Sequence, residues 1–252
     1  MDRTALHEND NLEQLVIAQL SDSNRPDWFT SYTIAFRELM AYYRCAMVEV
    51  AARFDVLDQE FSLKFDHNPI EAVKTRLKAP QSIFDKLRRH QQAMTIDSIE
   101  ENLSDVAGVR IICAFTSDIY ALADAFLKQD DIKLLYRKDY IRSPKENGYR
   151  SLHLIVETPI YLLDHKRSMK VEVQLRTIAM DWWASLEHKI TYKKDLALPE
   201  EAYRQLTACA EAAAALDNRM ESIALTARFL EADKYKDATA EMTGSEDRNA
   251  DQ

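Results

Sequence analysis

The sequence predicts an α+β protein, in which a mixed α/β sheet of about five strands is flanked by helices and extended by helices at both ends. Three observations carry this prediction. Short β-rich and helical segments alternate between residues 106 and 194, which is typical of a mixed sheet. Long apolar stripes with helical spacing precede and follow that region. With 252 residues, 46% of them apolar, the chain can bury one full core.

The N-terminal part is predicted to be helical up to a break at Pro69. The polar segment 1–27 contains an apolar patch at 12–20, which predicts one short helix. From Phe29 to Phe61 apolar residues recur every three or four positions. This spacing predicts one or two long amphipathic helices.

Strands and helices are then predicted in turn. The segment DHNPIEAVKTRLK (66–78) favours a strand, and PQSIFDKLRRHQ (80–91) favours a helix with Pro80 near its start and cations in its last turn. Further strands are predicted at 106–115, 132–141, 151–158 and 169–176, and further helices at 117–129, 177–194 and 199–230. The helix at 117–129 has Ser117 or Asp118 as its predicted N-cap.

The last predicted strand alternates strictly between apolar and polar residues. One face carries Val171, Val173 and Leu175, and the other carries Lys170, Glu172, Gln174 and Arg176. Beyond the final helical segment, residues 231–252 are acidic and weakly apolar, which predicts a disordered tail.

Composition excludes several classes of function. A net charge of −9 argues against wrapping of bulk nucleic acid. Segments 64–90 and 133–150 are nevertheless basic, which favours discrete anion sites, with solvated helix faces as the alternative. No stretch is apolar enough for a membrane span, and the start has no secretory signal. Cys45, Cys113 and Cys209 lie far apart, which predicts buried thiols in a reducing cytoplasm, without disulfides or zinc.

The segment KENGYRSLH (145–153) places one of only three glycines among basic and aromatic residues. Asn147-Gly148 between two predicted strands is typical of a hairpin turn. A plain turn does not account for the side chains gathered around it, which are Lys145, Tyr149, Arg150 and His153. Basic groups donate to phosphates and a flat ring stacks on a base, so the segment indicates a nucleotide site.

Two carboxylates and a basic cluster complete the predicted site. Asp105 precedes a strand, and Glu172 projects from the polar face of another, where burial requires a partner. The pair suits Mg²⁺, which takes one or two carboxylates plus substrate phosphates. Pairing of Glu172 with a neighbouring cation is the alternative. The cluster predicted to hold a polyphosphate consists of Arg76, Lys78 and Lys86.

Four motifs in order carry a resemblance to a known family: RLKAPQSIFDKL, LSDVAGVRII, RKDYIRSPKENGYRSLH and VEVQLRTIAMDWWASLEHKI. They closely resemble the synthetase domain of the RelA/SpoT family, whose members make the alarmones ppGpp and pppGpp of the stringent response. The resemblance covers residues 28–230, and the last motif is similar to that of the single-domain small alarmone synthetases, the RelQ type in particular. It implies a nucleotidyltransferase-like sheet and a GTP pyrophosphokinase activity, the Mg²⁺-dependent transfer of pyrophosphate from ATP to the 3′-hydroxyl of GDP or GTP.

The resemblance also implies roles for individual residues. ATP would be bound by Arg76, Lys78, Lys86 and Arg110, with Arg110 against the adenine. Asp105 and Glu172 would bind Mg²⁺, and Glu172 would also accept the proton of the 3′-hydroxyl. The acceptor nucleotide would be surrounded by Lys138, Lys145, Asn147, Tyr149, His153 and Ala184, with Tyr149 stacked on guanine and Gly148 turning the backbone to aim it.

The expected partners follow from the same resemblance. A homotetramer is implied, and the long terminal helices either form its interface or close the core of one subunit. An allosteric (p)ppGpp ligand and single-stranded RNA stay open as partners, and no membrane partner is expected. Two other functions stay open: pyrophosphorylation of tRNA or adenosine nucleotides, and RNA binding without catalysis, against which the two carboxylates argue.

Synthesis without hydrolysis is predicted. No histidine is followed by aspartate, and the segment ahead of Arg76 is too short for the family's hydrolase domain. The family's C-terminal regulatory domains are also not expected.

Overall fold

The computed structural model describes residues 27–65, 67–191 and 198–246. The helix predicted at 12–20 lies outside these residues, as does the last part of the acidic tail. None of the helices in the described ranges is both long enough and apolar enough to cross a membrane.

Five strands form one mixed sheet in the described part of the chain. They are β1 (Ile70–Leu77), β2 (Ala107–Cys113), β3 (Lys133–Asp139), β4 (Leu152–Tyr161) and β5 (Lys166–Thr177). Their order across the sheet is β1-β2-β5-β4-β3. Strands β2 and β5 run parallel, and every other neighbouring pair is antiparallel. The predicted strands and the α+β class are confirmed.

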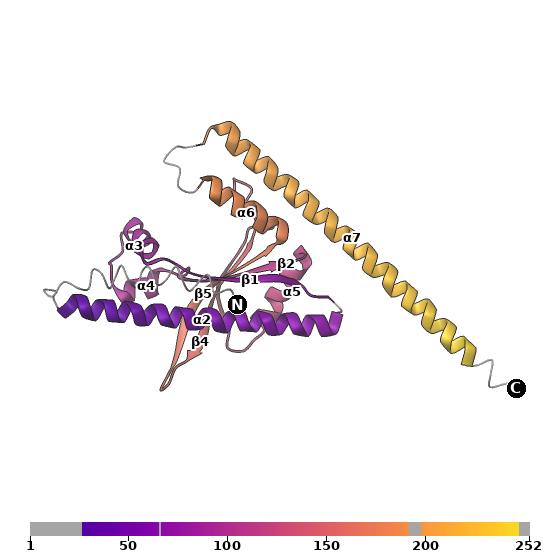
Figure 1. Cartoon of the computed structure of the whole chain (residues 1–252), viewed down its shortest axis with the longest axis horizontal. Coiled ribbons are helices and arrows are strands. Elements are labelled where there is room, and N and C mark those ends of the chain that lie inside the picture. The colour runs from indigo at the N-terminus through magenta and orange to yellow at the C-terminus, as the bar shows by residue number, and fades with distance from the viewer. Residues whose placement is uncertain (1–26, 66, 192–197, 247–252) are drawn as a thin grey trace.

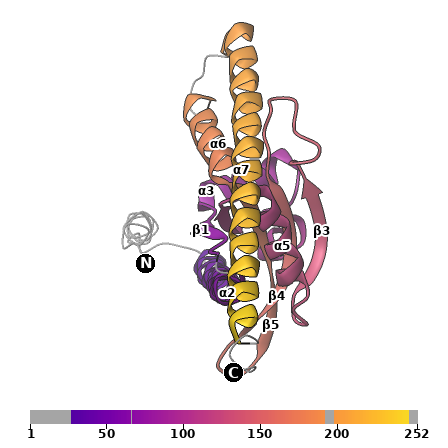
Figure 2. The ribbon, with the colours of Figure 1, turned by 90° about the vertical axis from the view of Figure 1, so that its right-hand side faces the viewer.

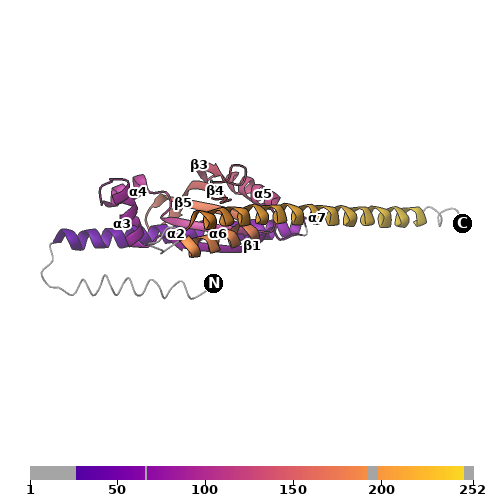
Figure 3. The same ribbon diagram turned by 90° about the horizontal axis from the view of Figure 1, so that it is seen from above.

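Helices lie on both sides of this sheet. They are α2 (Asp27–Phe65), α3 (Pro80–Arg89), α4 (Ile96–Asn102), α5 (Thr116–Leu127), α6 (Ile178–Thr191) and α7 (Glu200–Glu246). Figure 1 shows α2 along one side of the sheet, with α6 and the start of α7 on the other. Helix α6 lies beside the first half of α7 in Figure 2, and Figure 3 shows α7 extending far beyond the sheet.

The main core lies between α2, α5 and the apolar face of the sheet. Val171, Val173 and Leu175 are fully buried there, as the alternation of β5 predicts. Phe54 of α2 stacks on Phe126 of α5 with ring centroids 4.6 Å apart. Because its apolar stripe is used in this core, α2 forms one continuous helix through the segment for which one or two were predicted.

An ion pair ties the middle of α2 to the turn before β3. Arg53 donates to both carboxylate oxygens of Asp131, at 2.9 and 2.6 Å. The pair lies outside the predicted site.

Three details differ from the predictions. The N-cap of α5 is Phe115 and not the predicted Ser117 or Asp118, and the Asp118 carboxylate accepts a hydrogen bond from the Phe115 backbone at 3.1 Å. Helix α7 continues to Glu246, through most of the segment predicted to be a disordered tail. The prediction of buried cysteines is wrong for Cys45 and Cys209, which lie on the outer faces of helices, whereas Cys113 is buried in β2.

Candidate active site

The register of the sheet aligns one polar residue from each of the five strands. Lys74 of β1 pairs with Arg110 of β2, and Arg110 pairs with Gln174 of β5. Gln174 pairs with His153 of β4, and His153 pairs with Lys138 of β3. Paired residues share a face, so this row crosses the sheet opposite the apolar core. The site therefore lies on the polar face of the sheet.

A neighbouring row brings Arg76 and Glu172 to the two sides of Gly108. Arg76 of β1 and Glu172 of β5 both pair with Gly108 of β2. The glycine leaves no side chain between them on this face. Arg76 is exposed, and Glu172 is partly buried.

Asp105 holds two of the predicted phosphate-binding lysines. Lys78 and Lys86 each place Nζ 2.8 Å from its Oδ2 atom. Burial raises the pKa of the Asp105 carboxyl, but the hydrogen bonds and charges of the two lysines outweigh it, and the pKa lies below its ordinary value. Asp105 is therefore ionised and draws β1, α3 and the start of β2 together.

Glu172 is held by two neighbours on the polar face. Its Oε1 lies 3.1 Å from His153 Nδ1, and its Oε2 accepts a hydrogen bond from Gln174 Nε2 at 2.9 Å. Burial raises the pKa of Glu172, but the bonds from His153 and Gln174 bring it below its ordinary value. The sequence predicts that this carboxylate needs a partner, and the structure supplies two, the His153 ring and the Gln174 amide.

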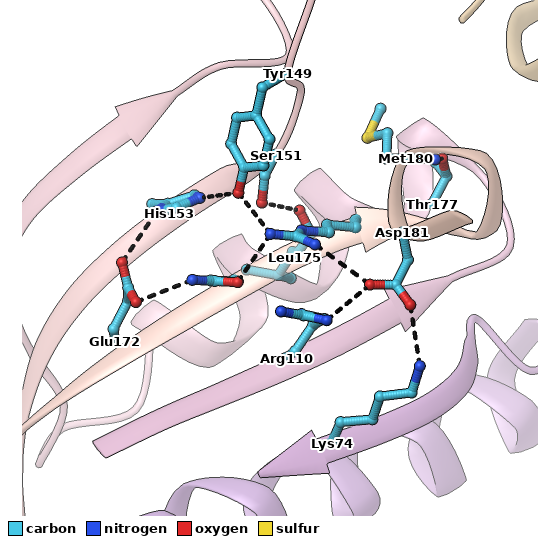
Figure 4. A network of polar contacts seen from close by, with 12 residues as sticks. Lys74, Arg110, Tyr149, Ser151, His153, Glu172, Leu175, Thr177, Met180 and Asp181 are labelled. Atoms are coloured by element: carbon cyan, nitrogen blue, oxygen red, sulfur yellow. Dashed lines mark hydrogen bonds and ion pairs between the residues drawn. The ribbon is translucent and has the colours of Figure 1, made fainter. Parts of the chain in front are cut away.

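Tyr149 continues this chain of hydrogen bonds, as Figure 4 shows. Its hydroxyl lies 2.8 Å from His153 Nε2 and accepts a bond from Arg176 Nη2 at 2.6 Å. The Glu172 carboxylate can only accept, so His153 carries a hydrogen on Nδ1, and in the neutral imidazole Nε2 accepts the tyrosine hydrogen. The bonds therefore run in one direction from Arg176 to Glu172.

The ring of Tyr149 is half-buried and makes cation–π contacts with two basic side chains. Lys145 Nζ lies 5.0 Å and the Arg176 guanidinium 5.1 Å from the ring centroid. The ring also packs against a small cluster formed by Trp183, Ala184 and Ala210. Predicted acceptor residue Ala184 thus lies beside Tyr149, whereas Asn147 and Lys138 are exposed.

Gly148 is required for two reasons, only one of which the sequence indicates. Its φ of +86° is a conformation that L side chains rarely adopt. A Cβ atom here would also lie 2.5 Å from the Cβ of Ala210 on α7. The turn prediction is confirmed, because Gly148 N donates to Lys145 O at 2.8 Å in the loop that joins the antiparallel strands β3 and β4.

Arg150, which the sequence offered as a phosphate donor, points elsewhere. Its Nη1 donates to the backbone oxygens of Gly148 and Ala210, at 3.5 and 3.4 Å. The residue therefore ties the loop to α7.

Two buried residues of the site were not predicted, Arg176 and Asp181. Arg176 of β5 is 5% exposed and Asp181 of α6 is 6% exposed. Asp181 accepts hydrogen bonds from Lys74, Arg110 and Arg176. The signal in the sequence is a lone carboxylate in the apolar start of a helix, which burial obliges to find a cation.

The carboxylates Asp105 and Glu172 have the oxygen ligands that Mg²⁺ prefers. The Oδ1 atom of Asp105 is buried without a hydrogen-bond partner in the described part of the chain, and its charge raises the pKa of Glu172 against the stronger lowering effects. The described residues contain no group of three or more His, Cys, Asp or Glu side chains that could hold a metal. Mg²⁺ needs only one or two carboxylates where phosphates supply other ligands.

Comparison with known proteins gives the class to which this fold and site belong. A sequence pattern described as the region found in RelA / SpoT proteins matches residues 75–197. The GTP pyrophosphokinase YwaC of Bacillus subtilis is 45% identical over 178 residues, which are 71% of this chain and 85% of YwaC. The chain belongs to the RelA/SpoT family.

Solved structures narrow the resemblance within that family. Small alarmone synthetase 2 from Bacillus subtilis is similar with a TM-score of 0.69 and 41% identity, over 76% of this chain and 98% of that one. Small alarmone synthetase 1 from the same organism, bound to its product pppGpp, has a TM-score of 0.69 and 34% identity, over 75% and 95%. The predicted resemblance to small alarmone synthetases is confirmed.

Proposed function

We propose that this protein is a (p)ppGpp synthetase, which transfers pyrophosphate from ATP to the 3′-hydroxyl of GDP or GTP. One observation carries the proposal: Glu172, which ends the bonded chain Tyr149–His153–Glu172, feels the charge of Asp105, which holds the lysine pair. The proposed base platform, proton acceptor and phosphate clamp would thereby serve one reaction. The names of the similar Bacillus subtilis proteins, a GTP pyrophosphokinase and small alarmone synthetases, support it.

The donor half of the site consists of Arg76, Lys78, Lys86 and Asp105, with Arg110 beside it. The lysines approach one carboxylate oxygen at 2.8 Å, so they are already gathered where a polyphosphate would need them. Arg76 is exposed on the same side and is free to turn toward a nucleotide. Transfer of a phosphoryl-type group depends mainly on such positioning and charge neutralisation.

The acceptor half consists of Tyr149, His153, Glu172 and Arg176. The Tyr149 ring would stack on guanine once Lys145, which lies over it, moves toward the base. Asn147 and Ala184 would contact the same nucleotide, and Lys138 its phosphates. This half would place the 3′-hydroxyl beside Glu172.

Glu172 would accept the proton of the 3′-hydroxyl as the new bond forms. Its lowered pKa keeps it ionised, and His153 and Gln174 fix the direction of both oxygens. Asp105 and Glu172 would hold Mg²⁺, an ion that neutralises the charge of the transferred phosphates when bound.

We also propose a homotetramer, for which α7 gives the support. Four of its exposed apolar residues follow the heptad spacing of a helix seam, and they are Leu216, Met220, Ile223 and Leu230. The corresponding stripe of α2 is used inside the subunit. Light scattering coupled to size exclusion tests this, and a monomer at micromolar concentration contradicts it. An allosteric (p)ppGpp ligand and single-stranded RNA remain open as partners.

The product of the purified protein tests the proposed reaction. We expect ATP and Mg²⁺ with GDP or GTP to give ppGpp or pppGpp, identified by mass spectrometry. A product formed from tRNA or adenosine nucleotides alone would support pyrophosphorylation of those acceptors. RNA binding without any transfer would support a non-catalytic RNA-binding protein. We also expect no Mn²⁺-dependent loss of added ppGpp, because the predicted activity is synthesis alone.

A further inference from the structure

We propose that Asp181 is a positioning residue that joins the two halves of the site, by holding Arg110 on the ATP side and Arg176 on the acceptor side. The inference rests on the proposed function, because it takes Arg110 as a contact of ATP and Tyr149 as the platform for the acceptor base. Asp181 itself touches neither substrate in this account.

Three strands send a cation to this one carboxylate, as Figure 4 shows. Its Oδ1 accepts from Arg110 Nη1 at 3.0 Å and from Arg176 Nη1 at 3.3 Å. Its Oδ2 accepts from Lys74 Nζ at 3.0 Å. Asp181 lies in α6, so the helix fixes one anchor for arginines of two neighbouring strands.

Without the Asp181 carboxylate, the positive charges of Arg110 and Arg176 would repel each other, with little water to screen them. Burial lowers the pKa of Arg110, and the charge of Arg176 lowers it further, whereas Asp181 raises it. A buried cation that loses its counter-ion is strongly destabilised and moves toward water. Removing the Asp181 charge should therefore displace both guanidinium groups.

On the acceptor side, the effect passes through Arg176. Its Nη2 donates to the Tyr149 hydroxyl at 2.6 Å and to Gln174 Oε1 at 3.1 Å. Gln174 in turn donates to Glu172 at 2.9 Å. One guanidinium thus orients both the ring proposed to stack on guanine and the proposed proton acceptor.

On the ATP side, the bond to Asp181 is compatible with stacking. Hydrogen bonds of a guanidinium lie in its plane, whereas a base stacks on its face. The Arg110 side chain is 30% exposed, so it remains accessible while one edge is held. Asp181 therefore prepares Arg110 for a base and does not compete with the base.

The test is a pair of double-mutant cycles on the full chain. We expect Asp181→Asn to weaken binding of the ATP analogue AMPCPP by roughly tenfold in the unaltered protein, but by less than about twofold in an Arg110→Met background. For GDP, we expect Asp181→Asn to weaken binding by the same roughly tenfold in the unaltered protein, and by less than about twofold in an Arg176→Met background. Calorimetry measures both ligands, and thermal unfolding is recorded for every variant.

Asp131→Asn is the matched control, because it breaks an arginine pair, with Arg53, that involves no residue of the proposed site. We expect it to lower the unfolding temperature without changing either affinity. If Asp181→Asn does not fold, Asp181→Glu replaces it, since it keeps the charge and moves the carboxylate by one methylene. Its loss of affinity should again vanish in the two methionine backgrounds.

Equal losses in the presence and absence of the arginines would overturn the inference, as would unchanged or tighter binding in Asp181→Asn. Failure of the proposed function looks different. In that case Arg110→Met would leave AMPCPP affinity unchanged, and Arg176→Met would leave GDP affinity unchanged, before Asp181 is altered.

Discussion

The acceptor half and the donor half of the site differ in how their polar groups are satisfied. In the acceptor half, Tyr149, His153, Glu172 and Arg176 bond to one another at 2.6 to 3.1 Å. In the donor half, Asp105 is the shared partner of two lysines, and Arg76 is exposed. The acceptor half is held together by its own hydrogen bonds without a ligand. In the donor half, the two lysines are paired with Asp105 until a ligand binds.

This difference follows from what each half is proposed to hold. A ring and a hydroxyl need a fixed surface and a directed proton acceptor, which a bonded network provides. A polyphosphate carries several charges, and it can replace one carboxylate as the partner of the lysines. Substitutions in the acceptor half should therefore change the positions of the bonded side chains. Substitutions in the donor half should change the charge available to the polyphosphate.

The largest effect is expected from Glu172→Gln. The amide cannot accept the hydroxyl proton or serve as an anionic metal ligand, so turnover should fall by about 100-fold or more. AMPCPP affinity should change little, because the donor half keeps its lysines. Steady-state synthesis and calorimetry measure the two effects, and near-normal turnover would refute the role of Glu172.

Tyr149 separates stacking from hydrogen bonding in the acceptor half. Tyr149→Ala should weaken binding of the acceptor nucleotide by roughly 1–3 kcal/mol, the usual contribution of a base stacked on an aromatic ring. Tyr149→Phe keeps the ring and loses the bonds to His153 and Arg176, so a smaller loss is expected. The acceptor KM of each variant checks this, and an unchanged KM in Tyr149→Ala counts against the platform.

Gly148 tests whether the acceptor half depends on α7. Gly148→Ala should destabilise the protein by about 1–3 kcal/mol, because of its positive φ and the nearby Ala210 Cβ. Adding Ala210→Gly removes the contact but leaves the strained φ, so recovery should be partial. Urea midpoints give the values, and full stability of Gly148→Ala would argue that the loop is not fixed as described.

The smallest effect is expected from acid. Asp105 and Glu172 have pKa values below their ordinary ones, so the folded protein binds fewer protons than the unfolded chain. Their contribution to stability is complete above pH of about 4 to 4.5, and it is lost as the pH falls through the lower folded-state values. Urea unfolding followed from about pH 6 to about pH 3 should show a shallower pH dependence of stability for Asp105→Asn. An identical slope would contradict the lysine pairing.

Much of the fold could be predicted because local patterns specify it. Pro69 and Pro80 mark where helix gives way to strand and strand to helix, and the alternation of β5 separates its two faces. The N-cap prediction at Ser117 or Asp118 was wrong, since the cap is Phe115 and the Asp118 carboxylate reaches back to its backbone from the first turn.

Less of the site could be predicted, because it depends on register. The proposal for Glu172 needed only one strand and its alternation. The place of Asp181 depends on how α6 sits over three strands, and the approach of Gly148 to Ala210 joins residues far apart in the chain. Neither relation leaves a local pattern in the sequence.

The central claim is that Asp105 and Glu172 serve one reaction centre, although they belong to different halves of the site. Turnover of Asp105→Asn, Glu172→Gln and the double variant tests it most directly. Groups that act as a unit are not additive, so we expect the double variant to be no slower than the worse single variant. A double variant slowed by the product of the two single effects would contradict the claim.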